Sequence, residues 1–118
     1  MTRILLVDDE PELLEAWSFA LEYVGNDVVR ARDSREALDQ MKRLPPELVI
    51  TDLMMPGMNG DALCRMIRNN PEWARIPIVL HTSAHVGIPV GERLWDSVLR
   101  KPARLEVFLA TIENLTRG

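Results

Sequence analysis

The chain has 118 residues, of which 47% are hydrophobic and 27% are charged, and its formal net charge is −4. These values fit one ordinary globular domain and exclude a disordered or fibrous protein, because domains run to about 100–200 residues and globular chains are about 25% charged. The acidic balance argues against direct nucleic-acid binding, which depends on Lys and Arg neutralising phosphates. The single cysteine, Cys64, excludes an internal disulfide and a CxxC metal site.

In the first half of the chain, short apolar runs alternate with amphipathic stretches. Residues 4–7 form a continuous aliphatic run that stops at an acidic pair, which is typical of a strand buried on both faces. Residues 11–24 have apolar side chains at helical spacing, with proline in the first turn and glycine as the stop. Residues 27–31 predict a second strand. Residues 34–44 predict a second helix, which a Pro-Pro pair ends.

The second half of the chain continues the alternation, although residues 84–97 specify little. At most one or two helical turns near residues 92–95 are expected there, because proline and glycine oppose a helix interior. Five strand–helix units of this kind predict a parallel sheet with helices on both faces and a short or irregular fourth helix. The other predicted elements are strands at 48–51, 76–81 and 98–100 and helices at 61–69 and 105–115.

Acidic and polar side chains stand where the predicted strands end. Ligand sites in open α/β sheets lie at the carboxyl ends of strands, so we expect the carboxylates there to converge. Like charges so close repel one another strongly unless a cation offsets them. The sequence therefore predicts a cation site at this edge of the sheet. The residues at the strand ends are Asp8, Asp9, Asp52, Thr82 and Lys101.

The expected cation is Mg²⁺, which accepts carboxylate oxygens and keeps several waters. Asp9 and Asp52 are the predicted direct ligands, and Asp8 is predicted to hold a metal-bound water. The backbone carbonyl of Met54, just after Asp52, is a further candidate ligand. Alternatively, Asp8 and Asp9 only cap the following helix, since acidic side chains favour a helix N-terminus. The hydroxyl and the ammonium at the other two strand ends favour the first interpretation, because an anionic phosphoryl group needs both.

Four motifs in chain order carry a resemblance to a known family. They are Asp8-Asp9, the run DLMMPGMNG at residues 52–60, PIVLHT at residues 77–82, and Lys101-Pro102. Together they resemble the response-regulator receiver domains of two-component signalling, over essentially the whole chain. The resemblance implies a flavodoxin-like (βα)5 three-layer sandwich with a five-stranded parallel sheet of order 2-1-3-4-5.

The resemblance also implies a chemistry for the acidic edge. Asp52 would accept a phosphoryl group from a phosphohistidine on a sensor histidine kinase or a histidine phosphotransfer protein, with Mg²⁺ bound, for which Mn²⁺ can substitute. Lys101 would stabilise the phosphoryl oxygens. Thr82, which fits the spacing from Pro77 better than Ser83 does, would bond one of these oxygens after transfer and so act as the switch.

The sequence departs from the family pattern in the switch region. Receivers usually carry an aromatic residue three positions before the lysine, and here that switch position is Val98, a stiff β-branched residue. Trp95 would have to replace the missing ring. Met54 and Ala84 take the two positions that line the approach of the hydrolytic water, and neither side chain can orient a water, so slow loss of the phosphoryl group is expected.

These expectations define a signalling module rather than an enzyme: a single receiver domain over residues 1–118, with no output domain in this chain, in the cytoplasm. It would act on a downstream protein target or a fused output domain, without contacting nucleic acid or membrane directly, and a homodimer stays open. The alternative is a degenerate, phosphorylation-independent receiver that serves as a scaffold or dimerisation module. A phosphohydrolase is disfavoured, because Met54 replaces the acid/base carboxylate that such enzymes commonly carry.

Several other side chains have plainer interpretations. His81 falls inside a predicted strand and is expected to be a packed or rim histidine, and Trp17 is expected to pack in the core. Arg65, Arg68 and Arg75 form a basic grouping around the third helix, which a solvated helix face explains.

Overall fold

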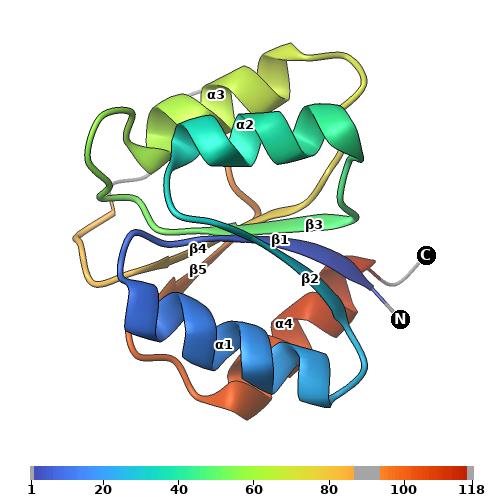
Figure 1. Ribbon diagram of the computed structural model, residues 1–118, viewed down its shortest axis with the longest axis vertical. Coiled ribbons are helices and arrows are strands. Elements are labelled where there is room, and N and C mark those ends of the chain that lie inside the picture. Colours follow the sequence, from blue (N-terminus) through green and yellow to red (C-terminus); the bar gives the residue numbers. More distant parts are fainter. Residues whose placement is uncertain (1, 87–93, 117–118) are drawn as a thin grey trace.

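The computed structural model describes residues 2–86 and 94–116, which form five strands and four helices. All five strands are parallel and lie in one sheet of order β2-β1-β3-β4-β5 (Figure 1). The sheet order predicted from the resemblance is confirmed. The strands are β1 (Arg3–Val7), β2 (Asp27–Ala31), β3 (Leu48–Thr51), β4 (Ile78–Thr82) and β5 (Ser97–Arg100), and the helices are α1 (Pro11–Tyr23), α2 (Ser34–Arg43), α3 (Gly60–Asn69) and α4 (Leu105–Thr116).

Helices cover both faces of the sheet, with α2 and α3 on one side and α1 and α4 on the other (Figure 1). Successive side chains of a strand point to opposite faces, so a strand covered on both sides must be apolar throughout. In β1, Leu5 and Val7 pack toward α2 and α3, whereas Ile4 and Leu6 pack toward α1 and α4. This explains why residues 4–7 of β1 form an unbroken aliphatic run.

Helix ends follow local chemistry. Pro11 opens α1 in the first turn, and Gly25, with φ of +100°, lies just beyond its end. The Asp33 side chain caps α2 by accepting a hydrogen bond from the Glu36 amide at 2.8 Å. No described helix has the length and apolar character that a membrane crossing requires.

The fourth strand differs from the sequence-based prediction at both ends. It begins at Ile78 rather than residue 76, because the Ile76 amide closes a turn on the Trp73 carbonyl at 3.0 Å. It includes Thr82 as its last residue. The predicted helical turns near 92–95 fall mostly outside the described residues, and the two described positions there, Leu94 and Trp95, are not helical.

Candidate functional site

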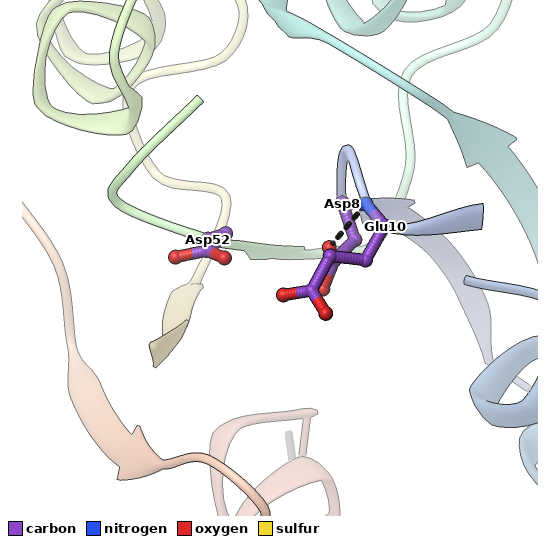
Figure 2. Close-up of side chains that lie close together, drawn as sticks. All are labelled: Asp8, Glu10 and Asp52. Carbon is purple, nitrogen blue, oxygen red and sulfur yellow. Dashed lines mark hydrogen bonds between the residues drawn. The ribbon is translucent and has the colours of Figure 1, made fainter. Parts of the chain in front are cut away.

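Carboxylates from two neighbouring loops converge at the carboxyl edge of the sheet. Asp8 and Glu10 lie on the loop after β1, and Asp52 directly follows β3 (Figure 2). One oxygen from each lies within 4.8 Å of the others. The Glu10 amide donates a hydrogen bond to Asp8 Oδ1 at 3.0 Å, which fixes the turn of the first loop. We call this set of three carboxylates, together with Lys101, the acidic cluster.

Lys101, immediately after β5, joins the three carboxylates. Its Nζ lies 2.7 Å from Asp52 Oδ2, 2.9 Å from Asp8 Oδ2 and 3.0 Å from Glu10 Oε1. Only 7% of the lysine side chain is exposed. One ammonium against three ionised carboxylates leaves a formal charge of minus two. A cluster with this excess suits a hard divalent cation, which prefers such oxygen ligands.

The two buried carboxyl groups of the acidic cluster have pKa values shifted in opposite directions. Burial, reinforced by the neighbouring Asp52 charge, raises the pKa of Asp8 despite bonds from the Glu10 amide and Lys101. Burial would also raise the pKa of Asp52, but hydrogen bonds from Lys101, the Thr82 hydroxyl and the Met54 amide bring it below its ordinary value. Burial alone would lower the pKa of Lys101, yet its carboxylate partners raise it well above the usual range. Asp52 is therefore the carboxylate that most firmly keeps its charge.

Backbone geometry places Asp52 against the start of α3. The Met54 amide donates to Asp52 Oδ1 at 3.2 Å, and the Gly60 amide donates to the Leu53 carbonyl at 2.8 Å. A Cβ on Gly60 would overlap the Asp52 carbonyl oxygen. Glycine is thus required at this first residue of α3 by close approach rather than by a turn.

The structure brings four of the predicted residues together: Asp8, Asp52, Thr82 and Lys101. Thr82 is 1% exposed, and its hydroxyl accepts a hydrogen bond from the Ala84 amide at 3.1 Å. Ser83, the alternative hydroxyl, is exposed.

Two neighbouring acids depart from the expected arrangement. Asp9 is half-buried and is not among the three converging carboxylates; it lines an open hollow of about 630 Å³ at the start of α1. Glu10, which the sequence analysis missed, takes the third place. Its signal was the run of three consecutive acids that begins at Asp8. The predicted ligand role of Asp9 stays a prediction.

The predicted switch region has no ring at its expected place. Val98 on β5 is 44% exposed. Trp95 is half-buried and packs, with Val86, against the core cluster under α2 and α3. It also lines a hollow of about 340 Å³ next to Leu53 and Met54.

His81 and Cys64 are both buried. His81 is packed, as predicted, edge-on against Trp17 and Phe108, with ring centroids 5.6 and 4.6 Å away. Burial and the Lys101 charge lower its pKa to about 4, which agrees with Nε2 accepting the Ala103 amide at 3.4 Å. Burial raises the pKa of the Cys64 thiol to about 12, so it is unreactive at neutral pH.

The prediction of a solvated face was wrong for one of the three arginines. Arg65 and Arg75 are exposed, but the Arg68 side chain is only 17% exposed and pairs with Asp96 at 2.8 Å. Arg68 is turned inward because its Nε and Nη1 groups donate hydrogen bonds to the backbone carbonyls of Ala74, Ile76 and Leu94. Backbone acceptors of this kind leave no trace in a charge pattern.

Comparison with known proteins identifies the family. Residues 4–113 match the response regulator receiver domain. The DNA-binding response regulator MtrA of Mycolicibacterium smegmatis is 42% identical over 118 residues, which cover 98% of this chain and 50% of MtrA. The regulator RpaA of Synechocystis is 32% identical over 123 residues, covering 99% of this chain and 50% of RpaA. The chain thus spans about half the length of these curated relatives.

Solved structures agree with this assignment. Response regulator TrrA of Thermotoga maritima, in complex with Mg²⁺-BeF, superposes with a TM-score of 0.88 at 28% identity, covering 98% of this chain and 99% of TrrA. Chemotaxis protein CheY4 of Vibrio cholerae gives 0.87 at 27% identity, covering 98% of both chains. The chain belongs to the response regulator receiver domains and is a signalling module rather than an enzyme.

Proposed function

We propose that Asp52 accepts a phosphoryl group from a phosphohistidine of a sensor histidine kinase or a histidine phosphotransfer protein. One carboxylate oxygen of Asp52 attacks the phosphorus, the bond from phosphorus to the histidine nitrogen breaks, and the imidazole leaves with the bonding pair. The observation that carries the proposal is Lys101 Nζ, 2.7 Å from Asp52 Oδ2 within a cluster of excess negative charge. This is the place where an ammonium can meet the oxygens of an incoming phosphoryl group.

The side chains around Asp52 support this role. Although Asp52 is buried, its pKa stays below the ordinary value, so the carboxylate remains ionised at neutral pH and is available as the nucleophile. Lys101, almost fully buried, supplies a fixed positive charge that needs little reorganisation during transfer. Thr82 stands at the end of the adjacent strand, where its hydroxyl helps to lower the pKa of Asp52, so a new phosphoryl oxygen on Asp52 would find that hydroxyl nearby. Thr82 is thus the proposed switch.

The donor set fits Mg²⁺, for which Mn²⁺ can substitute. The converging carboxylates of Asp8, Glu10 and Asp52 give this edge of the sheet an excess of negative oxygens, which attracts a hard divalent cation. We propose Asp9, Asp52 and the Met54 carbonyl as ligands, with Asp8 holding a bound water. When bound, the ion would offset the charge of the phosphoryl group during transfer. The complex of TrrA with Mg²⁺-BeF supports this assignment by similarity.

Output is proposed to pass through protein contacts, either to a separate target or to a fused output domain. MtrA and RpaA are DNA-binding regulators about twice as long as this chain, which supports the second form. Within residues 1–118 we propose a single receiver domain. A second candidate, a phosphorylation-independent scaffold or dimerisation module, is favoured by one observation, the exposed Val98 in place of a switch ring.

The test is intact-mass measurement after incubation with Mg²⁺ and acetyl phosphate. The native chain is expected to gain one phosphoryl group and Asp52→Asn none. Asp39→Asn, an exposed position on α2, is the matched control and should behave like the native chain. A native chain that stays unmodified, both here and with a phosphorylated histidine phosphotransfer protein as donor, would contradict the proposal and favour the scaffold.

A further inference from the structure

A second charge cluster lies at the opposite end of β5 from the acidic cluster. Arg68, in the last turn of α3, directs four hydrogen bonds to two segments of the chain, residues 74–76 and 94–96. Its Nη1 donates to the carbonyls of Ala74 at 2.9 Å and Ile76 at 2.8 Å, and its Nε donates to the Leu94 carbonyl at 3.1 Å. Its Nη2 donates to Asp96 Oδ2 at 2.8 Å. We call the pair Arg68–Asp96 the anchor.

Asp96 connects the anchor to the sheet. Its Oδ2 accepts the Ile78 amide at 2.8 Å, and its own amide donates to the Ile78 carbonyl at 2.8 Å. Asp96 therefore holds the first residue of β4 through both backbone groups. The β4–β5 ladder begins at the next pair, Val79 with Ser97. The anchor thus sets the register at which β5 starts.

The register of β5 decides where Lys101 stands. β5 has four residues and pairs only with β4, so no second neighbour corrects a slip. A slip of one residue would expose Leu99 and bury Val98. A slip of two residues would move Lys101 by about 6.6 Å along the strand. Its Nζ, now 2.7 Å from Asp52, would then lose that contact.

We propose that Arg68 and Asp96 are positioning residues for Lys101, which they place at the acidic cluster by fixing the register of β5. The inference rests on the proposed function, in which Lys101 stabilises the transferring phosphoryl group. Neither residue touches the reacting atoms. A role in general stability alone would leave the reaction unchanged as long as the chain is folded.

The experiment measures phosphoryl gain from acetyl phosphate with Mg²⁺, at a temperature well below the melting point of every variant. Arg68→Gln and Asp96→Asn remove one charge each. Arg68→Lys keeps the charge but loses the planar guanidinium group with its several N–H donors. Arg65→Gln is the control on the same helix, since the pair of Arg65 with Asp61 is exposed. We expect Arg68→Gln and Asp96→Asn to lower the saturating rate about tenfold, without changing the half-saturating donor concentration. Arg65→Gln should match the native rate.

Hydrogen exchange gives a readout that does not depend on phosphorylation. The Lys101 amide bonds the Thr82 carbonyl at 3.0 Å, and the Asp52 amide bonds the Val7 carbonyl at 3.1 Å. The proposal predicts faster exchange at Lys101 but not at Asp52 in the anchor variants. Equal acceleration at both amides would mean global destabilisation and would overturn it. An anchor variant that phosphorylates at the native rate would overturn it too.

The two proposals fail separately. If the native chain gains no phosphoryl group, the proposed function is wrong. The positioning of Lys101 by the anchor is then tested only by comparing amide hydrogen exchange at Lys101 with that at Asp52. If Arg68→Gln does not fold, Arg68→Lys and Asp96→Asn carry the same comparison, because each keeps hydrogen-bonding groups at the anchor.

Discussion

The acidic cluster and the anchor are two charge clusters at opposite ends of β5, and they differ in balance. In the anchor, one guanidinium meets one carboxylate, and backbone carbonyls take its other donors. In the acidic cluster, three carboxylates share one ammonium. Such a pair, with opposite charges in contact and further hydrogen bonds to the backbone, does not call for a cation from outside the chain. In the acidic cluster the carboxylates repel one another, and a bound cation would offset this repulsion. The fold thus provides a binding site at some cost in stability.

The largest effect is expected from unbalancing the anchor. Asp96→Ala leaves Arg68 partly buried without its counter-charge and should lower the free energy of unfolding by about 3–5 kcal/mol. Asp61→Ala, which breaks the exposed pair with Arg65 on the same helix, should cost only about 0.5 kcal/mol. Urea denaturation of both variants checks the difference. Equal costs would show that the anchor is no better than a surface ion pair.

Removing the ammonium of the acidic cluster comes next. Lys101→Met should slow phosphoryl gain about 100-fold, because a fixed charge at the transferring group is lost. Arg100→Met, the exposed neighbour on β5, should leave the rate unchanged. Mass measured against time after addition of acetyl phosphate gives both rates. Equal slowing in the two variants would point to damage to β5 rather than to lost charge.

His81 tests a buried group that stays neutral. Its pKa falls from 6.5 in the unfolded chain to about 4 in the folded one, so the unfolded chain binds the proton first as the pH falls. Stability should therefore drop between pH 6.5 and 4, by about 2 kcal/mol from pH 7 to pH 5. His81→Phe keeps a ring against Trp17 and Phe108 and should lose this part of the pH dependence. Urea denaturation of the native chain and of His81→Phe at pH 7 and pH 5 gives the free energy of unfolding in each case. An equal loss of stability in the two proteins between these pH values would refute the prediction.

Asp8→Asn should relieve the repulsion in the acidic cluster. The raised pKa of Asp8 means that its ionised form destabilises the folded state at pH 7, so the variant should melt at a higher temperature. The advantage should vanish as the pH falls through the folded pKa, where native Asp8 takes up its proton. Mg²⁺ should raise the melting temperature of the native chain more than that of the variant. Asp39→Asn is the control, and a variant less stable than the native chain at pH 7 would contradict the account.

The smallest effect concerns the lifetime of the phosphoryl group. The Met54 side chain is 59% exposed beside Asp52 and cannot orient a water. Met54→Asn should speed loss of the phosphoryl group several-fold. Intact mass measured against time after removal of the phosphodonor gives the rate. Met66→Asn, an exposed methionine on α3, is the matched control. Rapid loss from the native chain itself would mean that another group orients the water.

The positions of the strands and helices could be predicted because apolar runs, turn residues and strand ends are local signals, whereas the strand order came only from the family resemblance. Asp8, Asp52, Thr82 and Lys101 could be predicted to meet, since parallel strands bring their ends to one edge. The run of three acids marked Glu10 only as a candidate, because which of the three reaches Asp52 depends on how the first loop turns. The contacts of Arg68 could not be predicted, because its acceptors are backbone carbonyls from segments that adjoin it only after folding.

The contact between Gly60 and the Asp52 carbonyl links a helix to the acidic residue. Because a Cβ at Gly60 would overlap the Asp52 carbonyl oxygen, a larger residue at this position would push the first residue of α3 away from Asp52. A fluorophore at the exposed Met66 of α3 would test whether events at Asp52 reach this helix.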